Sequence, residues 1–92
     1  MREASWDPVK AAVNWRKHRV SFEEARTVIH DPLAWVDVDR SDPTDTRAKT
    51  IGWSRQGRLL VVITSVRGDT PRLISARRAT KRERHDHEHR RR

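Results

Sequence analysis

The sequence contains no cysteine, and this absence excludes several kinds of chemistry. Without thiols the chain has no cysteine nucleophile, no disulfide, and no zinc or iron–sulfur site that depends on cysteine ligands. A secreted domain of 92 residues usually needs disulfides, so the reducing cytoplasm is the expected location. No apolar run approaches the roughly 20 residues of a membrane-spanning helix, and no secretory signal is visible after Met1. We therefore expect a single domain with no membrane contact.

Acidic residues are scarce relative to basic ones: 13 Asp and Glu stand against 21 Lys and Arg, for a formal charge of +8. The excess is concentrated near the C-terminus, where residues 77–92 contain eight basic and three acidic side chains. Residues 31–45 have the opposite balance, with five aspartates and one arginine. A basic pole on a small domain is typical of a protein that binds nucleic acid or an acidic protein. Charge alone leaves a second interpretation open, in which the basic residues only keep the protein soluble.

Two helices are predicted in the N-terminal third of the chain. Asp7-Pro8 is a strong helix start, because Asp is a favoured N-cap and Pro fits the first helical position. Ser21 and Glu24 have the spacing of a capping box, in which each side chain binds the backbone N–H of the other residue. The Asp-Pro pair that follows residue 30 ends the second helix. We expect helices over residues 8–18 and 22–30.

The first predicted helix has two different sides. Val9, Ala12 and Val13 form an apolar arc, which we expect to pack against the core. A polar arc lies on another side, and it has two interpretations: a solvated helix surface or a functional one. The residues of this polar arc are Lys10, Asn14, Lys17 and His18.

The middle of the chain changes to the period of strands. Residues 59–66 include the run Leu-Leu-Val-Val-Ile, which is apolar on both faces and typical of a central strand. The order of elements predicts an α+β fold, in which two helices pack on one face of a three- or four-stranded antiparallel sheet. The other face stays open, which suits RNA binding. The expected strands are residues 34–38, 49–54, 59–66 and 72–77, with a weaker first strand over residues 2–6.

Residues 80–92 form a strongly polar segment. Thr80 and Glu83 repeat the capping-box spacing and predict a last helix. No apolar side chain follows Ala79, so this helix has nothing to bury in the core. We expect a compact domain over residues 1–79 and a basic helix or tail over residues 80–92.

The sequence resembles the BrnT-type toxins along most of its length. The resemblance implies a small RelE-like fold and the function of a ribonuclease toxin in a bacterial type II toxin–antitoxin pair. Two features differ from the family pattern: Arg19 stands where a glycine is usual, and three tail histidines stand where a tyrosine is common, in a chain without tyrosine. The residues that carry the resemblance are Trp6-Asp7, Lys10, Asn14, Lys17-His18, Val20 to Ala25, Ile51-Gly52, Arg58 to Val62, Ile74 to Thr80 and Glu83-Arg84.

The resemblance implies RNA cleavage without a metal or cofactor, in which the ribose 2′-OH attacks the neighbouring phosphate. His18 is the expected acid–base residue, because the reference pKa of histidine is about 6.5. Lys17 and Arg77 are the expected phosphate ligands, and Arg67 at a loop tip is a second guanidinium. Thr64 or Ser75 is expected to position the 2′-OH. The expected RNA contacts are Lys10, Asn14, Thr64, Ser75 and Arg78.

The resemblance also implies a protein partner. Toxins of this family are held inactive by a cognate antitoxin that binds operator DNA, so we expect a hetero-oligomer that reaches DNA only through the antitoxin. Lys81, Arg82 and Arg84 in the last helix are the expected partner contacts. Two alternatives remain: a catalytically inactive RelE-like module that partners a DNA-binding antitoxin, and a stand-alone basic protein that binds nucleic acid. The four tryptophans are expected in the core rather than stacked on bases.

Overall fold

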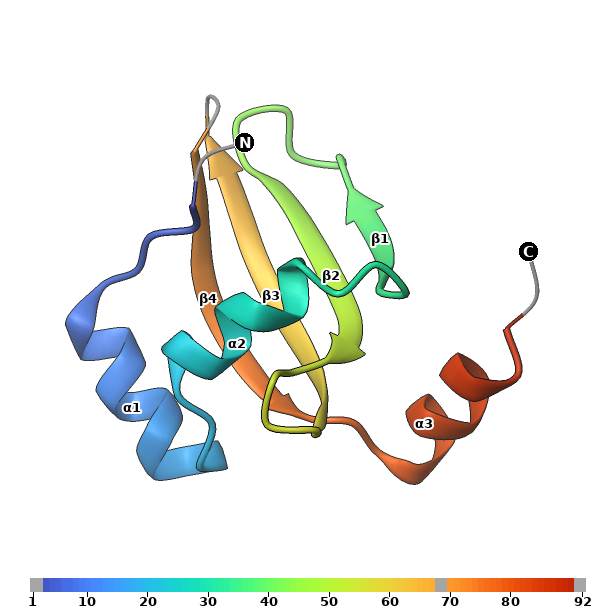
Figure 1. The fold of residues 1–92 in the computed structure, drawn as a ribbon. Helices are drawn as coiled ribbons and strands as arrows, with labels where there is room; N and C mark the ends of the chain where they lie inside the picture. The colour runs from blue at the N-terminus through green and yellow to red at the C-terminus, as the bar shows by residue number, and fades with distance from the viewer. Residues whose placement is uncertain (1–2, 68–69, 91–92) are drawn as a thin grey trace.

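The computed structural model describes residues 3–67 and 70–90, in which a four-stranded antiparallel sheet is combined with three helices (Figure 1). The predicted α+β fold is confirmed, with strands in the order β1-β2-β3-β4. None of the helices in these ranges is long and apolar enough to cross a membrane. The elements are α1 (Pro8–His18), α2 (Phe22–Ile29), β1 (Trp35–Asp39), β2 (Thr46–Trp53), β3 (Leu59–Arg67), β4 (Thr70–Arg78) and α3 (Lys81–Glu88).

Both N-terminal helices begin where predicted. Asp7 caps α1, and its carboxylate accepts a hydrogen bond of 2.9 Å from the backbone N–H two residues later. Ser21 caps α2 and accepts from the backbone N–H of Glu24 at 3.0 Å. The other half of the predicted capping box is wrong, because the Glu24 carboxylate accepts from Ser54 and Arg58 instead. The hydrogen bond from Arg58 lowers the pKa of Glu24, so a buried ion pair ties α2 to the β2–β3 turn.

The weak first strand over residues 2–6 is wrong in its described part. Residues 3–6 contain an isolated parallel bridge between Ser5 and Arg72 and no longer strand, and residue 2 lies outside the described residues. The backbone N–H of Ser5 donates to the carbonyl of Pro71 at 3.1 Å, and its own carbonyl accepts from Leu73 at 2.8 Å. These two bonds occupy part of the outer edge of β4.

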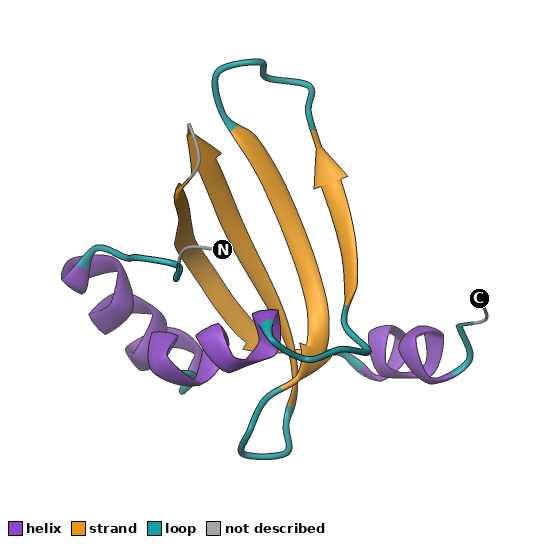
Figure 2. Cartoon of the chain, turned by 45° about the horizontal axis from the view of Figure 1, so that its top comes forward, coloured by secondary structure: helices purple, strands orange, loops and turns teal. Residues whose placement is uncertain are grey.

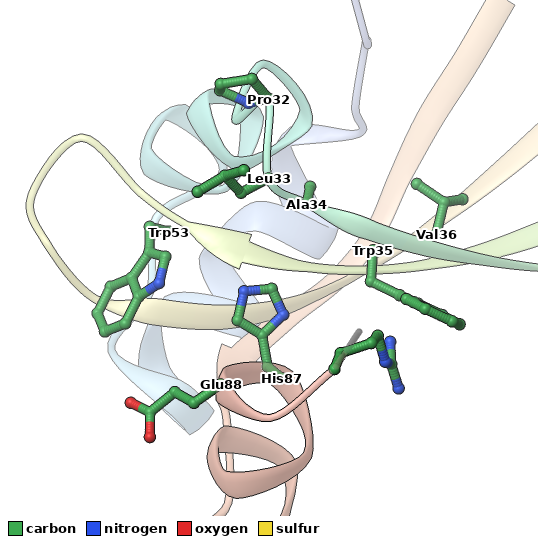
Figure 3. A pocket seen from close by; sticks show the side chains of 9 residues that line it. Pro32, Leu33, Ala34, Trp35, Val36, Trp53, His87 and Glu88 are labelled. Atoms are coloured by element: carbon green, nitrogen blue, oxygen red, sulfur yellow. The ribbon is translucent and has the colours of Figure 1, made fainter. Parts of the chain in front are cut away.

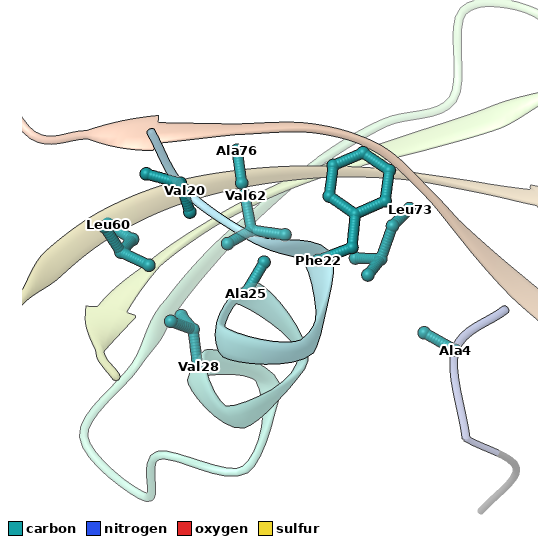
Figure 4. Close-up of a cluster of buried hydrophobic side chains, with 9 residues drawn as sticks. All are labelled: Ala4, Val20, Phe22, Ala25, Val28, Leu60, Val62, Leu73 and Ala76. Atoms are coloured by element: carbon teal, nitrogen blue, oxygen red, sulfur yellow. The ribbon is translucent and has the colours of Figure 1, made fainter. Parts of the chain in front are cut away.

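The main core lies between α2 and the sheet (Figure 4). β3 is the most buried strand, as predicted, and its residues alternate between the two faces of the sheet. The core on the α2 side consists of Ala4, Val20, Phe22, Ala25, Val28, Leu60, Val62, Leu73 and Ala76. A smaller cluster on the opposite face consists of Ile51, Leu59 and Val61, against which Trp53, Ile63 and Ala79 pack. We call this second face, which α2 does not cover, the open face.

α1 packs against the edge of β4, and its orientation differs from the prediction. Val9 and Val13, expected in the core, are 69% and 50% exposed, whereas Asn14 is only 5% exposed. Asn14 Nδ2 donates to the carbonyls of Val20 at 3.0 Å and Ala76 at 2.8 Å, and Oδ1 accepts from the Ala76 N–H at 3.0 Å. Backbone groups at a buried strand edge need partners. An amide therefore occupies the inner side of α1, and the apolar arc faces solvent.

α3 leaves the end of β4 and lies on the opposite side of the molecule from α1 (Figure 2). Its predicted capping box is complete: Thr80 Oγ1 accepts from the Glu83 N–H at 3.1 Å, and Glu83 accepts from the Thr80 N–H at 2.9 Å. No residue of α3 is buried. The helix is therefore attached to the sheet through polar and aromatic contacts rather than through an apolar face.

Replacing Asn14 with alanine is expected to destabilise the fold by about 2–4 kcal/mol, because both backbone groups of Ala76 lose their partner in a buried place. For a domain of this size the melting temperature should fall by roughly 10–30 °C. Val13→Ala, on the adjacent position of α1, is the matched control and should shift it by only a few degrees. Thermal melts followed by circular dichroism compare the two, and equal melting temperatures would contradict the structural role of Asn14.

Candidate functional site

The open face carries three rows of side chains that run across the strands. Side chains alternate along a strand and paired residues share a face, so every member of a row lies on the same side of the sheet. β1 contributes carboxylates to this face, and β2 and β4 contribute cations. From β1 to β4 the rows are Trp35–Ile51–Val61–Arg77, Asp37–Lys49–Ile63–Ser75 and Asp39–Arg47–Ser65–Arg72.

Arg77, one of the predicted phosphate ligands, is held by a carboxylate from α3. Its Nη1 and Nη2 donate to the two oxygens of Glu83 at 2.8 and 2.9 Å, and Lys49 Nζ lies 3.7 Å from the same carboxylate. The hydrogen bonds from Arg77 lower the pKa of Glu83 to about 2, and Glu83 raises the pKa of Arg77. Arg77 is thus an ion-paired guanidinium rather than a free one. Its side chain is still 38% exposed, and its remaining N–H donors can bind an anion.

Arg67, the second predicted guanidinium, lies at the other end of the sheet. It is six residues beyond Val61, the strand partner of Arg77, which corresponds to about 20 Å along β3. Arg67 and Arg77 therefore do not form one phosphate site, and the expectation that they share a catalytic centre is corrected. Periodicity along the chain gave no estimate of this distance because the two residues are on different strands.

Arg67 belongs instead to a cationic pocket of about 390 Å³ at that end of the open face. Asp45 organises the pocket: it accepts from Ser65 and from Arg47 Nε at 3.2 Å, and it lies 4.0 Å from Arg67 Nε. The Ser65 hydroxyl is the main cause of the lowered pKa of Asp45. We call the cations that line this pocket the distal cluster; they are Lys10, Arg47, Arg67 and Arg72.

The bond between Asn14 and Ala76 fixes how α1 lies along β4. Lys10, near the start of α1, belongs to the distal cluster together with Arg72, near the start of β4. Since Asn14 binds Ala76 further along both elements, α1 and β4 run in the same direction. Lys17 is seven residues after Lys10 and lies on the same stripe of the helix, at the opposite end from the distal cluster. The structure therefore brings Lys17 toward the end of β4 that contains Arg77.

His18 lies on a different stripe of α1 from Lys17. Ala11, seven residues before His18, packs against the core on the α2 side. His18 is half-buried on that same side, about 100° around the helix from exposed Lys17. Lys17 and His18, expected to act on one phosphate, thus face different ways from the end of α1.

Three further predicted RNA contacts are not on the open face. Asn14 is buried, and its amide is fully used by backbone groups. Thr64 is 5% exposed and points to the α2 side, because it alternates with the open-face residues of β3. Arg78 is paired with Leu60 and lies on the α2 side, where its charge contributes to the lowered pKa of Glu24. Ser75, by contrast, is half-buried on the open face.

The tryptophans divide into two pairs. Trp6 packs edge-to-face on Phe22, with ring centroids 5.9 Å apart, and Trp53 packs against the small open-face cluster, so core packing is confirmed for both. For Trp15 and Trp35 the prediction is wrong, because they are 48% and 40% exposed. An arginine lies over each exposed ring.

The three predicted partner contacts of α3 have different surroundings. Lys81 and Arg82 are exposed, whereas the guanidinium of Arg84 lies 5.1 Å from the ring centroid of Trp53. The sequence analysis missed Lys49, Arg47 and Arg72 as site residues. The alternation of Arg47 and Lys49 along β2 was an available signal, but the strand was expected to begin at Lys49, which left Arg47 in a loop.

The ion pair of Glu83 predicts a specific dependence of stability on pH. Its folded pKa of about 2 lies below the ordinary value of 4.5, so its stabilising effect is complete above that value and is lost as pH falls toward 2. Glu83→Gln should cost about 0.5–1 kcal/mol at pH 7, after allowance for the partial exposure of Arg77. The difference in melting temperature between the wild-type chain and Glu83→Gln should narrow from pH 5 to pH 2. A gap that stays constant with pH would contradict the ion pair.

Comparison with known proteins places this geometry in a family. A comparison with curated protein sequences gives no match. The crystal structure of the Brucella abortus ribonuclease toxin BrnT matches with a TM-score of 0.62 at 21% identity, covering 88% of this chain and all of that one, which supports the shared fold. The family model for BrnT, the ribonuclease toxin of a type II toxin–antitoxin system, matches residues 6–83, from Trp6 into α3. The chain therefore belongs to the BrnT family of ribonuclease toxins.

Proposed function

We propose that this ribonuclease toxin binds RNA across the open face and cleaves it without a metal ion. The observation that carries the proposal is the arrangement of cations on that face: the distal cluster lies at one end, and Arg77, Lys49 and Lys17 lie toward the other. Asp45 and Glu83, the carboxylates that hold these cations, are already ion-paired. An RNA backbone that follows β2 and β4 on this face would therefore meet positive charge along its path.

The proposed reaction begins with the 2′-OH of a ribose, whose oxygen attacks the adjacent phosphorus. A bond forms between O2′ and phosphorus, the bond to the 5′ oxygen breaks, and a cyclic phosphate results. Negative charge accumulates on the phosphoryl oxygens in between, and preorganised cations stabilise such charge most effectively where they need not reorganise. The Glu83 carboxylate holds Arg77 in place before RNA arrives, so Arg77 is the proposed main ligand of the scissile phosphate, with Lys17 beside it.

Proton transfer requires a group that changes its charge near neutral pH. We propose that His18 accepts the proton of the 2′-OH and then gives a proton to the departing 5′ oxygen, because the reference pKa of histidine, about 6.5, suits both steps. His18 ends α1 at the same end of β4 as Arg77, and its ring is only half-buried. In this arrangement the RNA strand passes around the end of α1, so that the 2′-OH lies on the His18 side and the phosphate on the Lys17 side.

Membership of the family implies an antitoxin partner. We propose that this antitoxin binds DNA, so that the assembly reaches operator DNA through it, and that the complex forms in the cytoplasm. The exposed ammonium of Lys81 and guanidinium of Arg82 on α3 are the proposed contacts with its acidic side chains. Arg84 is less suited to this role, because its guanidinium already lies over Trp53.

Metal independence is tested with purified protein and a labelled single-stranded RNA in excess EDTA. Cleavage should continue at an unchanged rate, and the products should end in cyclic phosphates, since the proposed nucleophile is the 2′-OH. An RNA with 2′-deoxy sugars throughout is the control and should stay intact. Loss of cleavage in EDTA would contradict the mechanism, and absence of cleavage under all conditions would favour an inactive binding module.

Single alanine variants test the assignment of residues at the end of β4. Arg77→Ala and Lys17→Ala should each lower kcat/KM by about tenfold or more, since each removes a charge from the phosphate. His18→Ala should lower kcat by about a hundredfold and remove the pH dependence near neutrality. Lys81→Ala, an exposed cation at the start of α3 that the proposed cleavage chemistry does not use, is the matched control. If His18→Ala cleaves like Lys81→Ala, the proton acceptor is a different group.

A further inference from the structure

A second pocket, of about 630 Å³, lies where α3 meets β1 and β2 (Figure 3). Its volume is in the range of pockets that hold a small organic group. The indole rings of Trp35 and Trp53 contribute aromatic surface, and the imidazole of His87 projects from α3 between them. Arg90 and Glu88 complete the polar part of the lining. Neither the family model nor the proposed cleavage chemistry assigns a role to this pocket.

Two polar atoms in this pocket lack partners. In the part of the chain that the structure describes, His87 Nδ1 and Arg90 Nη1 are the buried side-chain nitrogen or oxygen atoms without a hydrogen bond, and both residues line the pocket. Buried polar groups in proteins are nearly always hydrogen-bonded, so each such atom calls for an explanation. Both atoms are covered by neighbouring protein atoms, so a ligand with hydrogen-bonding groups along one edge would satisfy them once the two side chains turn toward the cavity.

The aromatic surface adds a second requirement to the ligand. The guanidinium of Arg90 lies 3.2 Å from the ring centroid of Trp35, so the exposed indole already stacks on a flat, delocalised group. A ligand that replaces this guanidinium must itself be flat. An aliphatic ligand would not stack, and a simple anion would use only Arg90. A nucleobase is flat, and its edge carries both carbonyl oxygens and ring nitrogens.

We infer that this pocket binds a base of the RNA substrate, stacked on Trp35 with its edge against His87 and Arg90. The inference rests on the proposed function, because it needs an RNA strand on the open face. Trp35 shares a row with Arg77, and Lys49 lies in the neighbouring row on the strand next to β1. We expect the phosphate of the same nucleotide to meet Lys49, beside its strand partner Asp37, and the backbone to continue from there toward Arg77.

The test measures the affinity of a fluorescent 2′-O-methyl RNA, which cannot be cleaved through the 2′ position. Trp35→Ala should weaken binding by about tenfold, in line with the loss of one base stack. Val38→Ala is the control, since Val38 is an exposed apolar residue of the same strand that does not line the pocket. It should weaken binding less than about twofold. Trp35→Phe should restore most of the affinity, because the phenyl ring still stacks.

A second probe separates stacking from charge. An oligomer of the same length that has abasic sugars and intact phosphates should bind wild-type chain and Trp35→Ala equally. His87→Ala should weaken binding of the base-carrying RNA, and His87→Asn should restore it, since the Asn amide places a polar atom near the position of Nδ1.

Equal affinities of Trp35→Ala and Val38→Ala for the base-carrying RNA would overturn the base pocket while leaving cleavage on the open face intact. An equal effect of Trp35→Ala on both probes would also overturn it, since stacking would then play no part. A wild-type chain that neither binds nor cleaves RNA would overturn the proposed function and the pocket together.

Discussion

The side-chain amide of Asn14 links α1 to the edge of the sheet, and the positions of Lys10 and Lys17 beside the open face depend on that link. A strand edge presents N–H and C=O groups that need partners, and at Ala76 both are met by this one side chain. A third bond to Val20 fixes the turn that leads into α2. Because the amide sets the register of α1 along β4, Lys10 stands beside the distal cluster and Lys17 stands toward Arg77.

The same link explains why the elements were predictable from the sequence and their orientation was not. Asp7, Ser21 and Thr80 are caps that act within one helical turn, so local sequence was sufficient to locate the helix starts. The side of a helix that faces inward depends on what it packs against. Hydrophobic periodicity assumes an apolar neighbour, but α1 packs against a strand edge, which demands hydrogen bonds. Val13 was therefore expected inside and Asn14 outside, the reverse of the structure.

A different ambiguity limited the prediction of which face of the sheet each strand residue occupies. β3 is apolar on both faces, so its sequence does not reveal which of Thr64 and Ser65 faces α2. The pairing of strands settles this, and the irregularity between Ile63 and Thr64 changes the alternation along β4. Arg72 and Arg77 share the open face although they are an odd number of residues apart. Strict alternation would have put them on opposite faces.

Carboxylates hold the basic side chains of the open face in fixed positions. Long basic side chains lose conformational entropy when they bind an anion, and a fixed partner reduces that loss in advance. Glu83 completes the cap of α3, binds Arg77 and lies near Lys49, so one side chain joins the helix to the site. Ion pairs at a partly exposed surface contribute little free energy. α3 is thus held more weakly than α2, which is anchored by buried Phe22 and Val28.

This difference in attachment gives α3 a different role from that of the sheet and α2. The sheet and α2 form a rigid platform, on which the cations of β2 and β4 keep their spacing. α3 has no buried residue, and the two nitrogens without hydrogen-bond partners belong to His87 in α3 and to Arg90 just beyond its end. A helix in that state can adjust its position at low cost when a partner satisfies those nitrogens. The polar composition of α3 fits the proposed base pocket: an apolar helix would bury Trp35 and Trp53, whereas here guanidinium groups cover the two rings and a flat ligand can replace the one over Trp35.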